Sequence, residues 1–187
     1  MFDVAIIGAG AVGAFVARDL SRYRINVVLI DKELEVSEGT TKANSAIIHA
    51  GYDCVPGTLK AKLNVQGNKM FDRICDELDV PFKRIGSLVI ALSKEQLDII
   101  NELYERGRAN GVPGLEVIGR ERLKELEPNV NEDATGALYA KTAGIISPYE
   151  LALACAENAV TNGVTLKLDT EVKDIEIKKG GFIIKTS

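Results

Sequence analysis

Three glycines near the N-terminus have the spacing of a turn that holds a pyrophosphate. Gly8, Gly10 and Gly13 fit the pattern G-x-G-x-x-G and directly follow the apolar stretch 3–7. In such a turn the first glycine makes the tight bend, the second lets the backbone approach the phosphates, and the third lets a helix pack closely on the strand. The start of that helix favours negative charge, because its first N–H groups are unpaired and its dipole is positive there.

An acidic residue follows where ribose recognition requires one. The apolar stretch 25–30 ends at Asp31, roughly 20 residues beyond the glycines. Its carboxylate can accept hydrogen bonds from ribose hydroxyls, and its charge disfavours a 2′-phosphorylated ribose, although Lys32 beside it weakens that argument. This order of strand, turn, helix, strand and acid favours a dinucleotide site over a glycine-rich turn that binds nothing.

The elements around these residues predict an α/β fold with a parallel sheet. The stretch 3–7 is an apolar, β-branched run that suits a strand buried on both faces, and the stretch 25–30 predicts a second apolar strand. Between them, apolar residues recur at helical spacing and predict a crossover helix with one buried stripe, made of Val12, Val16, Leu20 and Tyr23.

Helix signals continue along the chain. A second amphipathic helix is expected over 58–79, with an apolar face of Leu59, Leu63, Gly67, Met70, Ile74 and Leu78. Capping boxes that begin at Ser93 and Ser147 predict two further helices. Residues 81–145 carry no nucleotide-binding pattern. We therefore expect a first part of a dinucleotide-binding domain at 1–80, an inserted substrate-side segment at 81–145, and a return to the first domain at 146–187.

Composition narrows the class of protein. The 187 residues are 46% hydrophobic and 27% charged, and no apolar run approaches the roughly 18 residues that span a bilayer. A net charge of -4 gives no reason to expect nucleic acid as a partner, and a single histidine argues against a zinc site. Three cysteines without a C-x-x-C pair suggest reduced thiols. We expect a soluble, cytoplasmic protein; no pattern supports membrane association.

A second stretch has the composition of a ligand-facing segment. Small and hydrogen-bonding residues dominate its first half, a short apolar run follows, and the one histidine of the chain precedes Ala50 and Gly51. Such a segment can lie against a flat ligand, because side-chain and backbone groups reach heteroatoms and no bulky side chain intervenes. The residues of interest are Thr40, Thr41, Asn44, Ser45 and His49.

At this point the sequence resembles a known family. The glycine turn, Asp31, and the motifs Thr41-Lys42-Ala43-Asn44-Ser45, Ile48-His49-Ala50-Gly51 and Gly144-Ile145-Ile146-Ser147-Pro148 are similar to those of the FAD-dependent oxidoreductases that include D-amino acid oxidase. The similarity is closest to the branch of glycerol-3-phosphate dehydrogenases and L-2-hydroxyglutarate oxidases. It covers nearly the whole chain. One departure is that Asp31 stands where many members have glutamate.

The resemblance implies a Rossmann-like FAD-binding domain with a parallel sheet, together with part of an α+β substrate-side layer. In that reading the three glycines hold the pyrophosphate, and Asp31 and Lys32 lie at the adenosine ribose. The polar residues of the second stretch, Thr40, Thr41, Asn44, Ser45 and His49, approach the pyrophosphate, the ribityl chain or the isoalloxazine. A backbone group of Val172 meets the adenine.

The resemblance also implies a reaction. A hydride would pass from a small hydroxy compound, preferably glycerol 3-phosphate, to the flavin. His49 would be the base, a flavin contact or a covalent attachment point, unless it is a purely structural histidine. An L-2-hydroxy-acid oxidase, an amine oxidase and a non-catalytic FAD-binding fragment are the alternatives. Arg84 is a candidate for binding a substrate phosphate or carboxylate. We expect the chain to be a fragment of a protein about twice as long, inactive alone.

Overall fold

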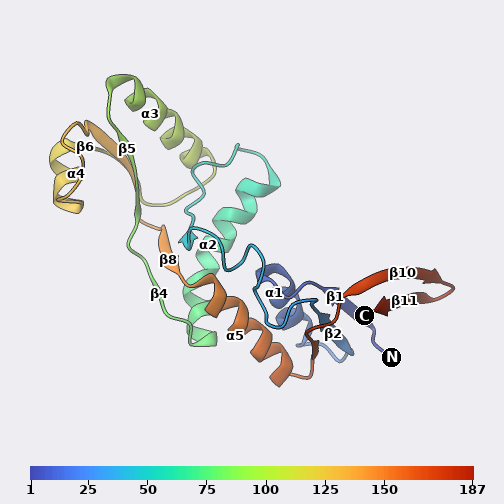
Figure 1. Cartoon of the computed structure of the whole chain (residues 1–187). Coiled ribbons are helices and arrows are strands. Elements are labelled where there is room, and N and C mark those ends of the chain that lie inside the picture. Colours follow the sequence, from blue (N-terminus) through green and yellow to red (C-terminus); the bar gives the residue numbers. More distant parts are fainter. The chain divides into compact units, whose positions relative to one another are not determined.

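The computed structural model describes all 187 residues, and they form two compact units. The first unit contains Met1–Ala46, Cys75–Pro81 and Ser147–Ser187, and the second contains Ile47–Ile74 and Phe82–Ile146 (Figure 1). The structure thus groups Ile47–Ile74 with the later segment, whereas the sequence analysis assigned residues 1–80 to the first domain. The functional assignment of these segments stays a prediction.

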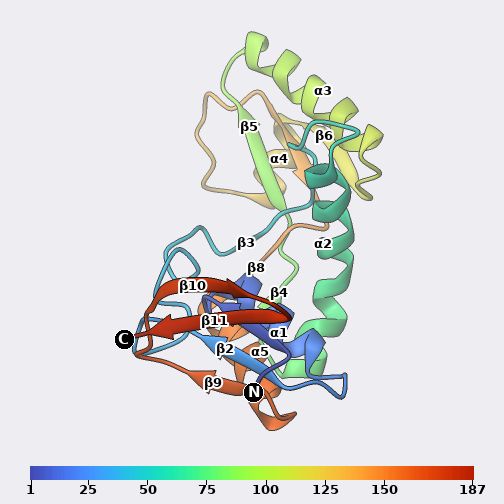
Figure 2. The ribbon, with the colours of Figure 1, turned by 90° about the vertical axis from the view of Figure 1, so that its right-hand side faces the viewer.

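The first unit is built on a parallel sheet. Its strands β1 (Val4–Ile7), β2 (Val27–Ile30) and β9 (Thr165–Lys167) lie in the order β1-β2-β9. Figure 2 shows β2 and β9 side by side. The predicted second apolar strand is confirmed as β2, and all residues of this central strand are buried. The expectation of a strand buried on both faces was wrong for β1, whose side chains alternate between half-buried and exposed. Successive side chains point to opposite faces of the sheet, and only one of these faces is covered at β1.

Two helices of this unit pack against each other through small side chains. Helix α1 (Ala11–Leu20) contacts α5 (Pro148–Thr161). Five alanines of these two helices are buried: Ala14, Ala17, Ala152, Ala156 and Ala159. The predicted stripe was wrong, since Val12 is 80% exposed and Val16 and Tyr23 are exposed too. Helices approach most closely where side chains are smallest, and here the alanine face of α1 meets α5.

Helix α2 (Leu59–Leu78) spans the range expected from the sequence, but a different face of it is buried. Leu59 is 68% exposed, and Leu63 and Met70 are exposed as well. The buried positions are instead Ala61, Val65, Asn68, Ile74 and Cys75. Of the predicted apolar face, only Ile74 is buried.

The second unit contains two antiparallel sheets. The first has the order β5-β7-β6, with β5 (Ser87–Ala91), β7 (Gly136–Ala140) and β6 (Leu115–Gly119). Helix α3 (Lys94–Ala109) packs on this sheet, and α4 (Arg120–Leu126) contacts β6 and β7 (Figure 1). The smaller sheet has the order β3-β8-β4, with β3 (Ile47–Ile48), β8 (Gly144–Ile146) and β4 (Phe82–Lys83).

Local sequence patterns correctly predicted where two helices begin and where the C-terminal hairpin turns. Ser93 and Ser147 each cap a helix by accepting a hydrogen bond from the backbone three residues on, at 3.4 and 3.3 Å. The hairpin of β10 (Val172–Lys178) and β11 (Gly181–Thr186) turns at Gly180, which has a φ of +92°. No helix combines the length and the apolar character needed to cross a bilayer.

Cys155 lies on α5 with no exposed surface. Burial raises the pKa of its thiol from 9.0 to about 11. The charged thiolate is therefore disfavoured in the folded chain.

We expect Cys155 to be unreactive until the chain unfolds. The thiolate is the nucleophile, so at pH 9 alkylation of the native thiol should be roughly 50-fold slower than in the unfolded chain from the raised pKa alone. The unfolded chain releases this proton first, so the same group lowers stability as the pH rises from 9.0 to about 11. Mass spectrometry of the alkylated peptide, with and without urea, measures the rates; equal rates would contradict the buried placement.

Candidate functional site

In the glycine turn between β1 and α1, backbone atoms lie so close together that a side chain on Gly13 would not fit. Gly8 has a φ of +103°, in the left-handed region that favours glycine. A Cβ atom on Gly13 would lie 1.8 Å from the carbonyl oxygen of Gly8, which is backbone and cannot give way. The third glycine of the motif is therefore required by contact between helix and strand.

The start of α1 is open to a ligand except on the side of Thr41. Gly10 is the N-cap residue and contributes no side chain. The backbone N–H of Ala11 donates to Oγ1 of Thr41 at 3.0 Å, and a Cβ on Gly10 would lie 3.0 Å from the same oxygen. The other N–H groups of the first turn have no acceptor within the helix. This arrangement suits an anion at the helix N-terminus.

The carboxylate of Asp31 reaches the same turn. Its Oδ2 accepts a hydrogen bond from the N–H of Ala9 at 2.5 Å, and its Oδ1 accepts one from the N–H of Glu33 at 3.0 Å. The backbone oxygen of Asp31 accepts from the N–H of Thr170 at 2.9 Å, two residues before Val172 at the start of β10. The structure thus brings Asp31, the glycines and the start of β10 to one end of the parallel sheet.

The remaining candidates of this unit belong to the loop after β2. Asn44 stabilises the loop, because its Nδ2 donates to the backbone oxygens of Thr40 and Thr41, at 3.3 and 2.7 Å. Ser45 and Lys32 are exposed, and Lys32 pairs only loosely with Glu33 at 3.5 Å. Among the predicted residues of this loop, Thr41 is the one whose side chain hydrogen-bonds the glycine turn.

His49 belongs to the second unit, where it follows β3. Its side chain is exposed, and it lines a cavity of 120 Å³ together with Gly51, Tyr52, Asp53, Cys54, Lys60 and Asn64. Its backbone oxygen accepts a hydrogen bond from Nδ2 of Asn68 at 2.9 Å. The alternative of a buried, purely structural histidine is therefore wrong, because the His49 side chain is exposed.

Arg84 is fully engaged inside the second unit. A guanidinium group has five N–H donors, and Arg84 makes five hydrogen bonds, to both carboxylate oxygens of Asp72, to Oδ1 and the backbone oxygen of Asn68, and to the backbone oxygen of Thr142. The bonded guanidinium lowers the pKa of Asp72. The expectation that Arg84 binds a substrate anion is therefore wrong in this structure, because no donor is left.

The sequence analysis did not single out Asn68. The available signal was that this polar residue shares a helix face with Val65 and Cys75. The periodicity of the larger apolar residues instead predicted that another face of α2 is buried. A polar residue among buried positions of a helix indicates hydrogen bonds to backbone of other elements.

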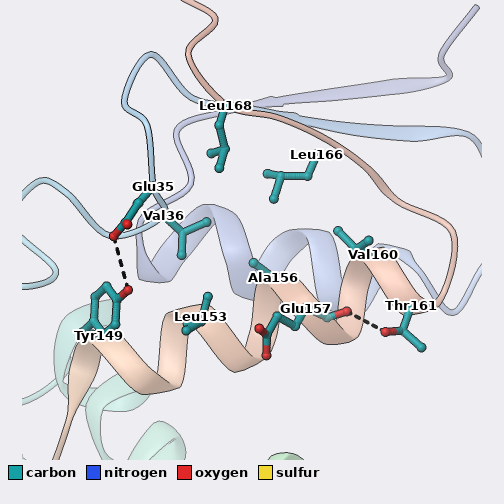
Figure 3. Close-up of a pocket in the computed structure, with 10 residues that line it drawn as sticks. All are labelled: Glu35, Val36, Tyr149, Leu153, Ala156, Glu157, Val160, Thr161, Leu166 and Leu168. Carbon is teal, nitrogen blue, oxygen red and sulfur yellow. Dashed lines mark hydrogen bonds between the residues drawn. The ribbon is translucent and has the colours of Figure 1, made fainter.

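A separate groove runs along α5 in the first unit (Figure 3). It has a volume of 680 Å³, and Leu153, Val160, Leu166 and Leu168 form much of its wall. The hydroxyl of Tyr149 donates to Glu35 at 3.4 Å, and the charge of Glu35 raises the pKa of that hydroxyl. None of the predicted site residues lines this groove.

Comparison with known proteins agrees with this geometry. Residues 3–187 match the family of FAD dependent oxidoreductases designated DAO. The glycerol 3-phosphate dehydrogenase of Caloramator mitchellensis is 57% identical over the whole chain, and the mitochondrial L-2-hydroxyglutarate dehydrogenase of Nematostella vectensis is 35% identical over 94% of it. The chain spans 39% and 38% of the lengths of these two relatives.

Solved structures of similar fold include two oxidases. The L-α-glycerophosphate oxidase of Mycoplasma pneumoniae, solved with FAD bound, superposes with a TM-score of 0.93 at 29% identity, over 99% of this chain and 49% of that one. The glycine oxidase of Geobacillus kaustophilus gives 0.91 at 26% identity, over 100% of this chain and 51% of the other. The fold is that of an FAD-binding α/β protein.

The chain belongs to the DAO family of FAD-dependent oxidoreductases. Its glycine turn fits the cofactor of that family on structural grounds. The close contact at Gly13, the N-cap residue Gly10 without a side chain and the carboxylate of Asp31 are features that suit a dinucleotide.

Gly13→Ala should destabilise the first unit by about 2 kcal/mol or more, because the added methyl group overlaps backbone that cannot repack. Gly39→Ala is the matched control, since a Cβ there meets nothing within 4 Å and its φ is not positive. Urea denaturation followed by circular dichroism compares the two variants. Equal midpoints would show that α1 does not lie this close to β1.

Proposed function

We propose that the protein containing this chain is an FAD-dependent oxidoreductase that oxidises a small hydroxy compound, with glycerol 3-phosphate as the first candidate substrate. The observation that carries the proposal is the convergence of Gly13, Thr41 and Asp31 on the start of α1. The choice of substrate is supported by the 57% identity to a glycerol 3-phosphate dehydrogenase, against 35% for an L-2-hydroxyglutarate dehydrogenase.

The residues of the first unit would hold the cofactor in defined roles. Backbone N–H groups at the start of α1 bind the pyrophosphate, and the glycines let it approach. Asp31 accepts hydrogen bonds from the adenosine ribose, with Lys32 beside it, and the backbone of Val172 lies at the adenine. The loop residues Thr40, Thr41, Asn44 and Ser45 complete the surroundings of the pyrophosphate and ribityl chain.

Bound FAD supplies the acceptor for the hydride that leaves the substrate carbon. The protein must take the hydroxyl proton in the same reaction, and we assign this role to His49. An imidazole is a suitable general base near neutral pH. The exposed side chain of His49 and the polar cavity beside it are consistent with access by a small polar substrate.

A substrate phosphate still requires a cationic partner. Arg84 cannot serve without giving up bonds to Asp72 and Asn68. Lys60 lines the cavity beside His49, and we assign the role of cationic partner to it. L-2-hydroxyglutarate, an amine substrate and a fragment that binds FAD without turnover remain the alternatives.

The substrate assignment is tested by anaerobic reduction of the flavin. In the protein that contains this chain at the full length of its relatives, glycerol 3-phosphate should bleach the visible flavin absorption within the time of turnover. L-2-hydroxyglutarate and glycine serve as comparison substrates. Bleaching by one of these alone would transfer the assignment to that substrate, and a protein without bound flavin would contradict the proposal.

Asp31→Ala should weaken FAD binding in the same protein by roughly 10- to 100-fold, because hydrogen bonds to a charged group are lost. Lys32→Ala is the matched control and should change the dissociation constant by less than about threefold, since its side chain is exposed and weakly paired. Quenching of flavin fluorescence measures both constants. Unchanged affinity in Asp31→Ala would refute the ribose assignment.

A further inference from the structure

Asn68 is a buried amide whose hydrogen bonds link three elements of the second unit. Its exposed fraction is 7%, although it lies on helix α2. The two N–H groups of its side chain donate to the backbone oxygens of His49 and Thr142, both at 2.9 Å. Its Oδ1 accepts from Arg84 at 3.3 Å. All donors of this amide are therefore used, and two of its bonds reach backbone far away in the sequence.

Arg84 holds the amide of Asn68 in place. The guanidinium contacts Asn68 at its side-chain oxygen and, at 2.7 Å, at its backbone oxygen. Nη2 of the same guanidinium also pairs with Asp72, one turn further along α2, at 2.6 Å, and Nε donates to the other carboxylate oxygen. Arg84 also stacks over the ring of Phe82, 5.6 Å from its centre. A group with this many contacts has a single orientation available, and it fixes which end of the amide faces His49.

The segment that carries His49 has few other regular bonds. Strand β3 contains only Ile47 and Ile48, and it pairs with Ile145 and Gly144 of β8. His49 lies directly after this short pairing. The bond from Asn68 is therefore the one described side-chain contact that holds the His49 peptide, and its loss would leave a carbonyl group without this partner.

We propose that Asn68 is a positioning residue that fixes the His49 backbone through its carbonyl oxygen, with Arg84 and Asp72 as the brace that orients Asn68. The proposal rests on the role of His49 as the base. Displacement of a catalytic group by about 1 Å can cost about 100-fold in rate. The effect of Asn68 should therefore be seen in kcat more than in KM.

The test is a double-mutant cycle in the full-length holoenzyme. Asn68→Ala should lower kcat by roughly 10- to 100-fold, with a much smaller change in KM. In a His49→Gln background, the same substitution should change kcat by less than about twofold, because the group that it positions is absent. Gln66→Ala, an exposed amide on the same helix, is the matched control and should leave kcat unchanged.

Hydrogen exchange provides a readout that does not depend on turnover. The amide of Ala50 shares its peptide group with the His49 carbonyl, and Ala50 is buried. Asn68→Ala should accelerate exchange in the peptide that contains Ala50, while peptides of α3 and β7 keep their rates. Arg84→Met should show the same pattern, and Arg84→Lys a weaker one, because lysine keeps the charge beside Asp72 but lacks the planar group.

The outcomes separate this inference from the proposed function. If Asn68→Ala lowers kcat by the same factor in both backgrounds, or if exchange at Ala50 is unchanged, the positioning role is overturned. If His49→Gln retains full kcat, the role of His49 as base fails, and the exchange result alone then decides whether Asn68 fixes this peptide. A large rise in KM for Arg84→Met without a change in kcat would instead make Arg84 a substrate contact and overturn the proposal.

Discussion

The contact between α1 and the turn that precedes it is the constraint on which the first unit depends. With no side chain at Gly13, the helix starts directly beside the carbonyl of Gly8. This position places the first N–H groups of α1 at the end of the sheet where β2 delivers Asp31 and where the following loop delivers Thr41. Because Gly13 lets the helix backbone lie against the Gly8 carbonyl, the N–H donors of α1, the Asp31 carboxylate and the Thr41 hydroxyl lie close together.

A second close contact fixes the position of α1. Alanines of α1 and α5 are buried against each other, and α5 arrives about 130 residues later in the chain. Arg18, on the same helix, is nearly buried and is paired with Glu77 at 2.5 Å, which joins the end of α2 to this unit. The glycine turn and α1 are thus supported by segments that are distant in sequence, and such long-range contacts slow folding.

The second unit contains polar side chains that are committed to structure next to the segment of His49. Asn68, Arg84 and Asp72 satisfy one another and the backbone of two chain segments. Such a network is stable only when every member is bonded, since unpaired buried polar groups are costly. It follows that the guanidinium of Arg84 has a structural role in this unit, because all of its donors are bonded within the chain.

The sequence alone determined the features that depend on local chemistry. The spacing of Gly8, Gly10 and Gly13 with Asp31 indicated the turn, and serine caps marked the starts of α3 and α5. The faces of the helices were decided by tertiary structure: the bulky stripes at Val12 and Leu59 are exposed, and alanines or Asn68 are buried instead. The role of Arg84 and the grouping of Ile47–Ile74 with the later segment also needed the structure. Periodicity reports that a helix has an apolar side, but burial depends on the shape of the surface that it meets, and that surface comes from distant parts of the chain.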